Sequence, residues 1–349
     1  NDGLISMKVD EVTATDIVCT VVDGGLVTNH KGVNVPGINL NMPYLSQKDM
    51  NDLSYGKEMD FDFIAASFCR SATDITIMRN YLEAIGWKDV KIIAKIENSQ
   101  GVENIDEIIR VADGIMVARG DMGVEIPFEK IPAIQKMIIE KVYKAGKIVV
   151  TATQMLESMI ENPRPTRAEI TDIANAIYDG TSAIMLSGES AVGKHPVEAV
   201  QAMTRIAQTT EADIDYKKRF DHFYQKTENR DITAAISHAT VTTAHDLNAA
   251  AIVTVTKSGT TARMISKFRP YTQIVGATTS DKVYRQLVLS WGVFPVKCDE
   301  KKNTDALFDH AVEVSKKANV LKHGDIAVIT AGIPLGISGT TNMLKVQVV

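Results

Sequence analysis

Short apolar runs alternate with amphipathic segments through the middle of the chain. Five runs have the near-continuous apolar character of strands that are buried on both faces: 61–68, 90–97, 114–121, 147–154 and 182–190. Each run precedes a segment whose apolar residues recur every three or four positions, as they do in a helix packed against a sheet. This pattern predicts an α/β fold, either a (β/α) barrel or a doubly wound sheet.

Segments of a different character flank these five units. Residues 1–35 include VTATDIVCTVVDGG, which alternates and turns like part of a small β domain. A charged stretch, DYKKRFDHFYQKTENRD, comes before a second α/β pattern, with strands expected at 249–256, 273–279, 293–298, 325–330 and 345–349. We therefore predict three parts: a β segment at 1–35, a (β/α) domain at 36–215 and a C-terminal α/β domain at 216–349.

Composition excludes several classes of protein. The 349 residues are 45% hydrophobic and 23% charged, which is ordinary for a globular protein. The net charge of -5 gives no basic footprint for nucleic acid, and no apolar run approaches the roughly 20 residues of a membrane span. Cys19, Cys69 and Cys298 are far apart and form no C-x-x-C, which favours a reducing, cytoplasmic location.

Polar residues recur where the five predicted strands end. They are Ser67, Lys95 with Glu97, Arg119 with Gly120 and Asp121, Thr151 with Thr153, and Ser187 with Glu189. In a (β/α) barrel the C-terminal ends of several strands together build the active site. A hydrophobic core needs none of these groups there, so the pattern predicts a functional site.

Lys95 and Glu97 lie two residues apart and share one face of their strand. Such charges are costly to desolvate unless they pair with each other, a metal or a charged ligand. Glu97 and Asp121 on neighbouring strand ends would repel unless a cation lay between them, and Mg²⁺ takes one or two carboxylates. A Lys95–Glu97 ion pair beside a surface Asp121 is the alternative, and these residues alone leave both open.

Gly120 and Gly123 bracket Asp121 and allow the backbone to approach a ligand closely. Backbone N–H groups in such a turn, near the start of a helix, favour an anion such as a carboxylate. A tight turn without a ligand would explain the glycines but not Arg119.

Five segments together resemble the pyruvate kinase family, of the bacterial type. They are KGVNVPG, IIAKIENSQG, IMVARGDMGVEIP, TATQMLESMIENPRPTRAE and DGTSAIMLSGESAVGKHPVEAV, in the order and spacing of the family. The resemblance covers essentially the whole chain. It implies a (β/α)8 TIM barrel, of which strands 4–8 are visible, a remnant of an inserted β lid, and a C-terminal effector-binding domain. By this resemblance the sequence looks like a member lacking its N-terminal portion.

The resemblance implies a reaction and roles for matching residues. The reaction is transfer of the phosphoryl group of phosphoenolpyruvate to ADP, giving pyruvate and ATP. Lys95 resembles the lysine that stabilises the phosphoryl group and the enolate. Glu97 and Asp121 resemble the ligands of Mg²⁺ or Mn²⁺, and Lys31 resembles a lysine that contacts the nucleotide.

Further roles follow from the same resemblance. Arg119, Gly120 and Asp121, together with Thr153, resemble binders of the substrate carboxylate. Thr153, Ser187 and Glu189 resemble catalytic residues of a proton relay. The family also implies a homotetramer, allosteric control and K⁺, whose ligands would lie outside this chain.

A Ser/Thr-rich loop in the C-terminal domain is a second candidate site. Its hydroxyls and amides would face a phosphate at a helix N-terminus, although such loops also occur without a ligand. The loop resembles the family's sugar-phosphate effector site, with GISGTTN (336–342) as its second loop. The residues implied are Thr256, Lys257, Ser258, Gly259, Thr260, Thr261, Gly339 and Thr340.

Two other functions remain open at this point. A Mg²⁺-dependent pyruvate or enolate lyase on a related barrel would share Glu97, Asp121 and the glycine turn, but would not need Lys31 or the C-terminal domain. A catalytically impaired, sugar-phosphate-binding fragment is the other alternative, because three of the eight barrel strands are not visible in the chain.

Overall fold

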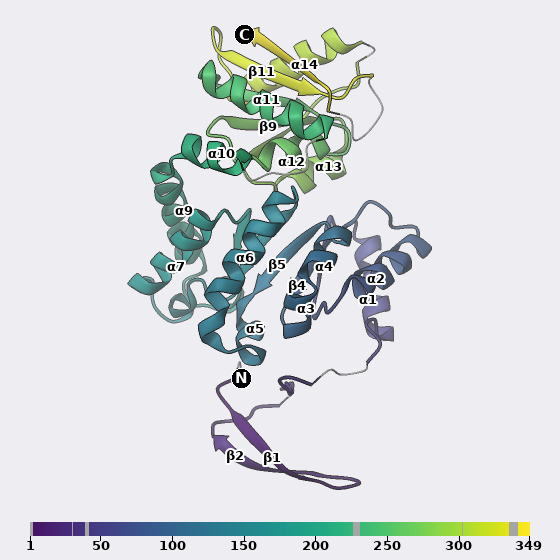
Figure 1. Cartoon of the computed structure of the whole chain (residues 1–349), viewed down its shortest axis with the longest axis vertical. Helices are drawn as coiled ribbons and strands as arrows, with labels where there is room; N and C mark the ends of the chain where they lie inside the picture. Colours follow the sequence, from purple (N-terminus) through teal and green to yellow (C-terminus); the bar gives the residue numbers. More distant parts are fainter. Residues whose placement is uncertain (1–2, 30, 39–41, 226–230, 302, 335–340) are drawn as a thin grey trace.

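The computed structural model describes residues 3–29, 31–38, 42–225, 231–301, 303–334 and 341–349. Three parts follow one another along the chain: a hairpin, a helix-covered parallel sheet, and a second sheet that contains the C-terminus (Figure 1). All five strands predicted in the middle of the chain and all five predicted near its C-terminal end are present.

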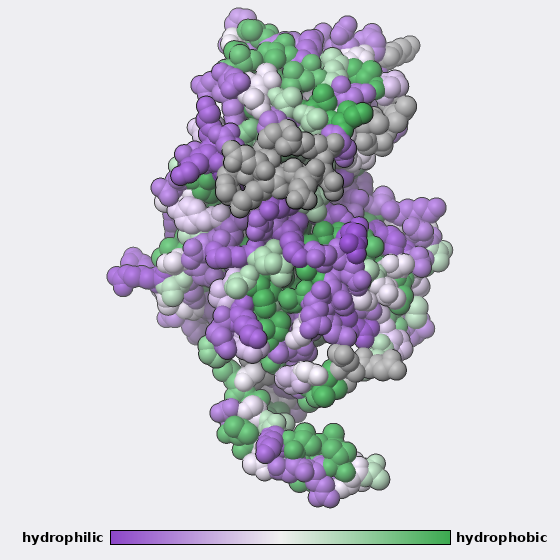
Figure 2. Space-filling model, in the orientation of Figure 1, coloured by the Kyte–Doolittle hydropathy of each residue, from purple (hydrophilic) through white to green (hydrophobic). Residues whose placement is uncertain are grey.

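The N-terminal hairpin pairs β1 (Ser6–Val12) with β2 (Ile17–Asp23) in an antiparallel register. Its apolar side chains lie at the surface, including Val9, which is 53% exposed, and Val22, which is 66% exposed. They form the apolar patches on the projecting hairpin in Figure 2. The predicted β segment is therefore present, but the apolar side chains of these two strands contribute nothing to a buried core.

The central sheet contains five parallel strands in the order in which they occur along the chain. They are β3 (Phe63–Ala66), β4 (Lys91–Ile96), β5 (Gly114–Ala118), β6 (Ile148–Ala152) and β7 (Ala183–Met185). A doubly wound sheet reverses its strand order, whereas a barrel wall does not. The order of these strands is therefore that of a barrel wall.

Helices follow the strands of this sheet as the periodicity predicts. They are α1 (Gln47–Glu58), α2 (Ala72–Ala84), α3 (Ser99–Glu103), α4 (Ile105–Val111), α5 (Arg119–Glu125), α6 (Ile131–Lys144), α7 (Arg167–Asp179), α8 (Gly188–Ala191) and α9 (Pro196–Asp213), with 3₁₀ turns at Phe128–Lys130 and Glu157–Ile160. Local chemistry sets several helix ends. Ser46 and Thr166 form capping boxes at the starts of α1 and α7, and Gly180 ends α7 with a φ of 100°.

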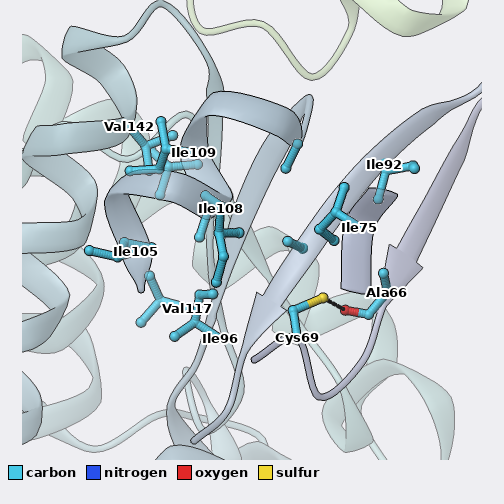
Figure 3. Close-up of a cluster of buried hydrophobic side chains, with 14 of the residues drawn as sticks. Ala66, Cys69, Ile75, Ile92, Ile96, Ile105, Ile108, Ile109, Val117 and Val142 are labelled. Atoms are coloured by element: carbon cyan, nitrogen blue, oxygen red, sulfur yellow. Dashed lines mark hydrogen bonds between the residues drawn. The ribbon is translucent and has the colours of Figure 1, made fainter. Parts of the chain in front are cut away.

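Branched and long aliphatic side chains fill the space between this sheet and its helices (Figure 3). Ile92 and Ile96 from β4 meet Ile75 from α2 and Ile108 from α4, and all four are fully buried. Strand β4, which contains Lys95 and is followed by Glu97, is therefore held along its length by close-packed side chains.

We expect Leu82→Ala to lower the free energy of unfolding by about 2–5 kcal/mol, because it opens a cavity in this core. Leu82 lies on α2 and has no exposed surface. Ile77→Ala is the control, since Ile77 lies on the same helix but is 42% exposed. Urea unfolding of both variants tests this, and equal losses would contradict the assignment of Leu82 to the core.

The second sheet has the order β10-β9-β8-β11-β12. Its strands are β8 (Ala251–Val255), β9 (Gln273–Thr278), β10 (Val293–Lys297), β11 (Ile326–Ala331) and the antiparallel β12 (Met343–Val348), and its helices include α11 (Ile232–Asp246), α12 (Thr260–Ser266), α13 (Asp281–Leu287) and α14 (Thr304–Lys317). Helix α10 (Tyr216–Gln225) connects the two parts. The strand order reverses between β8 and β11, which is where open α/β sheets bind ligands.

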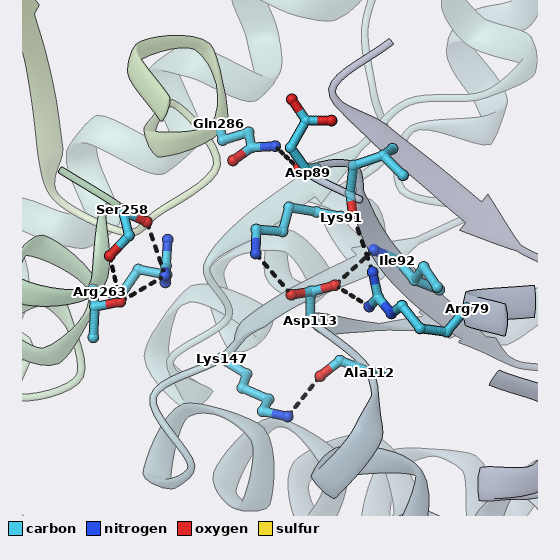
Figure 4. A network of polar contacts seen from close by, with 12 residues as sticks. Arg79, Asp89, Lys91, Ile92, Ala112, Asp113, Lys147, Ser258, Arg263 and Gln286 are labelled. Atoms are coloured by element: carbon cyan, nitrogen blue, oxygen red, sulfur yellow. Dashed lines mark hydrogen bonds and ion pairs between the residues drawn. The ribbon is translucent and has the colours of Figure 1, made fainter. Parts of the chain in front are cut away.

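Polar contacts join α13 to the central domain. Lys282 Nζ lies 2.8 Å from Asp60 Oδ1, and Arg285 Nε donates to Asp62 Oδ2 over 2.7 Å. Gln286 Nε2 donates to the carbonyl oxygen of Asp89 over 2.8 Å (Figure 4). These acceptors precede β3 and β4, so the C-terminal domain contacts the end of the sheet opposite to Lys95 and Glu97.

Candidate active site

Lys95 and Glu97 form an ion pair at the C-terminal end of β4. Lys95 Nζ lies 2.6 Å from Glu97 Oε1 and donates to Ser67 Oγ over 2.9 Å. The Glu97 side chain is 1% exposed, whereas that of Lys95 is 23% exposed. The carboxylate is therefore enclosed by protein, while the ammonium group can reach a ligand from the mouth of the site.

Glu97 also accepts a backbone hydrogen bond, from the N–H of Phe68 to Oε2 over 2.5 Å. Burial raises the pKa of Glu97 above its ordinary value, and the charge of Asp121 adds to this rise, although Lys95 and Phe68 N–H oppose it. The two carboxylates predicted to share a cation are thus near enough to repel each other. A bound cation would relieve that repulsion.

An open Mg²⁺ site takes few ligands from the protein. In the part of the chain that the structure describes, no group of three or more His, Cys, Asp or Glu side chains is placed to hold a metal. Mg²⁺ needs only one or two carboxylates, because water and phosphate oxygens fill its other positions. Two carboxylates such as Glu97 and Asp121 would therefore be enough protein ligands for a site of this type.

Helix α5 begins at Arg119, directly after β5, and its first turn contacts the loop after β6. The N–H of Gly120 donates to Thr153 Oγ1 over 2.9 Å, and Arg119 Nη2 donates to the Thr153 carbonyl over 2.6 Å. Arg119 Nη1 forms an ion pair with Asp172 of α7 at 2.6 Å. The structure thus brings Arg119, Gly120 and Thr153 together, with the guanidinium group holding the backbone of Thr153.

Thr153 has an unusual backbone conformation. Its φ is 68°, and Gln154 follows with a φ of 54°. A β-branched residue rarely adopts a left-handed conformation, and strain of this kind costs roughly 1–3 kcal/mol and concentrates at functional sites. The contacts from Arg119 and Gly120 explain how this strained conformation is held.

Glu189 joins the loops that follow β6 and β7. It is fully buried and accepts the N–H of Leu156 over 2.9 Å and the N–H of Ser187 over 2.7 Å. Ser187 itself is half-buried at the end of β7. The geometry makes Glu189 a residue that orients the loop bearing Ser187.

Lys31 is exposed in the irregular segment between β2 and α1. Among the described residues, no hydrogen bond or ion pair joins it to Lys95 or Glu97. Within the described residues, Lys31 therefore has no direct polar contact with the Lys95–Glu97 pair.

The structure describes part of the second predicted site, which is the Ser/Thr-rich loop after β8 and its neighbouring loop at 336–342. Ser258 Oγ lies 3.1 Å from Thr260 Oγ1, and Thr261 Oγ1 lies 2.9 Å from Thr341 Oγ1. The half-buried Arg263 guanidinium donates to the Ser258 carbonyl and to Thr260 Oγ1 over 3.2 Å each. Gly339 and Thr340 lie outside the described residues. The Thr261–Thr341 contact shows that the loop after β8 and the segment leading into β12 meet at the sheet's switch point.

Sequence reasoning missed two groups at the first site. Phe68 contributes its backbone N–H to Glu97, and a backbone donor has no sequence signature. Asp172 is one polar position on an amphipathic helix, and nothing in its spacing distinguishes it from a solvated residue. Ser67 was identifiable, because it is a polar residue at a strand end.

A parallel sheet whose strand ends collect a lysine–glutamate pair and a strained turn is that of an α/β enzyme of the (β/α) type. The chain belongs to the pyruvate kinase family. The family model "Pyruvate kinase, barrel domain" matches residues 1–200, and "Pyruvate kinase, alpha/beta domain" matches residues 234–347.

Relatives of similar sequence carry the name pyruvate kinase. The chain is 50% identical to that of Clostridium acetobutylicum over 349 residues, which covers 100% of this chain and 74% of the relative. It is also 50% identical to that of Clostridium perfringens over 348 residues, covering 99% and 73%. For Geobacillus stearothermophilus the identity is 50% over 353 residues, covering 100% and 60%.

These matches confirm the predicted family and its class of reaction, phosphoryl transfer from phosphoenolpyruvate to ADP, and they do not favour the lyase alternative. They also agree with the α/β class of both sheets. In the part of the chain that the structure describes, no helix is long and apolar enough to cross a membrane.

Proposed function

We propose that this chain transfers the phosphoryl group of phosphoenolpyruvate to ADP at the C-terminal ends of β4 to β7. The observation that carries this proposal is the placement of the partly exposed Lys95 ammonium group beside the enclosed Glu97 carboxylate. Phosphoryl transfer needs positioning and charge neutralisation more than covalent chemistry. A fixed lysine and a metal held by carboxylates meet that need.

In this proposal Lys95 places its positive charge against the transferring phosphoryl group and then against the enolate oxygen. Glu97 and Asp121 hold Mg²⁺ or Mn²⁺, which when bound neutralises negative charge on the substrate oxygens. Lys31 contacts the nucleotide from the segment beside the hairpin. K⁺ is the second cation in this proposal.

The turn after β5 binds the substrate carboxylate. Arg119, Gly120 and Asp121 supply the first turn of α5, and Thr153 supplies a hydroxyl that already accepts the Gly120 N–H. Arg119 acts by holding the strained backbone of Thr153. The hydroxyls of Thr153 and Ser187 then relay a proton to the enolate, as general acids do, while Glu189 fixes the loop of Ser187.

A coupled assay of ATP formation tests this proposal on the purified 349-residue chain with phosphoenolpyruvate, ADP, Mg²⁺ and K⁺. We expect the chain to form ATP and pyruvate in equal amounts. A chain that forms no ATP but binds fructose 1,6-bisphosphate would instead be the catalytically impaired fragment. Light scattering on the same sample tests the homotetramer that the family implies, and cell fractionation tests a cytoplasmic location.

In this proposal residues 36–215 form the catalytic domain and residues 1–35 form part of the lid. The C-terminal domain, residues 216–349, binds a sugar-phosphate effector. Two observations support the effector site. The loop formed by residues 256–261 leads into α12 at the strand-order reversal, and Thr261 contacts Thr341 at the edge of the second loop. Hydroxyls and amides at a helix start are suited to phosphate.

We expect Lys257→Ala to weaken binding of fructose 1,6-bisphosphate about tenfold, because it removes one charge-assisted contact to a phosphate. Lys257 is exposed in the loop after β8. Lys322→Ala is the control, since Lys322 is an exposed lysine that precedes β11, at the opposite end of the same sheet. Calorimetry measures both affinities. Equal binding by the two variants would place the effector elsewhere.

A further inference from the structure

Three consecutive residues after β3 contact the Lys95–Glu97 pair. Ser67 Oγ accepts from Lys95 Nζ over 2.9 Å, and the N–H of Phe68 donates to Glu97 Oε2 over 2.5 Å. The N–H of Cys69 donates to the Lys95 carbonyl over 3.3 Å. The turn formed by residues 67–69 therefore holds the ammonium group, the carboxylate and the strand backbone at once.

This turn is strained at its centre. Phe68 has a φ of 53°, in the left-handed region, although it is a bulky aromatic residue. Its side chain is 55% exposed, so burial of the ring does not stabilise the conformation. A strained backbone conformation of this kind persists only when contacts with the surrounding structure hold it in place. Contacts from elsewhere must therefore hold the Phe68 N–H toward Glu97.

Tyr44, which lies just before α1, makes such contacts. Its hydroxyl donates to the Ser67 carbonyl over 3.1 Å and lies 3.1 Å from Cys69 Sγ. Cys69 Sγ in turn donates to the Ala66 carbonyl over 3.1 Å (Figure 3). Each of these two groups has one hydrogen. Both carbonyls are satisfied together when Tyr44 donates to Ser67 and Cys69 donates to Ala66.

The Tyr44 hydroxyl remains a donor at neutral pH. Burial raises the pKa of Tyr44 above its ordinary value, and the nearby Cys69, Asp74 and Glu97 raise it further. The ring packs against the core shared by α2 and β4. The ring of Tyr44 is thus held by packing, and its protonated hydroxyl is directed at the turn of residues 67–69.

We propose that Tyr44 is a positioning residue for the Lys95–Glu97 pair and that it acts through the turn of residues 67–69. This inference rests on the proposed function, because it assigns the pair to catalysis. Tyr44 does not touch the reacting groups. Its hydroxyl holds the Ser67 carbonyl, the turn keeps its strained form, and Phe68 and Ser67 then fix the two charged side chains.

Tyr44→Phe removes only the hydroxyl and keeps the ring in the core. We expect kcat to fall about tenfold, because small displacements of positioned groups are costly in rate. The KM values for phosphoenolpyruvate and ADP should stay within about twofold of wild type, since neither substrate contacts Tyr44 in this account. Steady-state kinetics of the purified chain measures both parameters.

Tyr81→Phe is the matched control. Tyr81 packs against the same core, and its hydroxyl donates to the Met50 carbonyl over 2.9 Å, away from the turn. A purely structural role for Tyr44 predicts equal effects of the two variants on kcat. Equal effects would overturn the inference.

Amide hydrogen exchange provides a readout that does not depend on turnover. We expect exchange at Phe68 to be about tenfold faster in Tyr44→Phe and unchanged in Tyr81→Phe, because loss of the hydroxyl lets the turn open locally. Unchanged exchange in Tyr44→Phe would overturn the inference even if the chain is active. If the wild-type chain forms no ATP, the proposed function fails separately, and the exchange at Phe68 still decides whether Tyr44 holds the turn.

Discussion

Phosphoryl transfer is expected to fall by about 10²- to 10³-fold when Lys95 is replaced by methionine, the usual effect of removing one preorganised electrostatic group. Lys95 Nζ is placed by Glu97 and by Ser67, so its charge is aligned before substrate binds. Methionine keeps most of the length of the side chain but not the charge. The fold should persist, because Glu97 keeps the hydrogen bond from Phe68 N–H.

The measurement is kcat from the coupled assay, with circular dichroism to confirm folding. Lys91→Met is the control, because Lys91 begins the same strand and forms an ion pair with Asp113 over 3.0 Å. It removes the same charge from the opposite end of β4. Near-wild-type kcat in Lys95→Met, or equal losses in both variants, would rule out the role proposed for Lys95.

Removal of either proposed metal ligand is expected to raise the Mg²⁺ concentration needed for half activity by at least about tenfold. Glu97→Gln and Asp121→Asn each remove one negative charge and keep the shape of the side chain. Burial would still raise the pKa of Glu97 in Asp121→Asn, but the smaller contribution from repulsion by Asp121 would disappear. The double variant should lose little more than each single variant, because residues that act as a unit are not additive.

The measurements are the Mg²⁺ dependence of turnover and the direct binding of Mn²⁺ without substrate. Glu125→Gln is the control, since Glu125 lies on the same short helix as Asp121 and is half-buried. Strictly additive losses in the double variant would show that Glu97 and Asp121 have separate roles. If Glu125→Gln weakened metal binding as much as Asp121→Asn does, the effect would come from the total negative charge of α5 and not from a ligand at Asp121.

Much of the candidate site could be predicted because it follows from strand periodicity. Lys95 and Glu97 share a face because side chains alternate along a strand, and the structure confirms their contact. Two other strand-end residues that the sequence assigned to one site, Gly120 and Thr153, also contact each other. The direction of the Arg119 guanidinium could not be predicted, because its partner Asp172 lies on a helix 53 residues further along the chain.

The sequence by itself determined the alternation of strands and helices, the residues at each strand end and the family. These properties depend on local spacing, which a single chain displays directly. Only the tertiary structure decided that Phe68 N–H and the Tyr44 hydroxyl support the charged pair, and that the backbone of Thr153 is strained. Hydrogen bonds to the backbone and left-handed conformations of non-glycine residues arise from contacts between distant segments. No pattern of side-chain types encodes them, so they become visible only when β3, β4 and the segment before α1 are packed together.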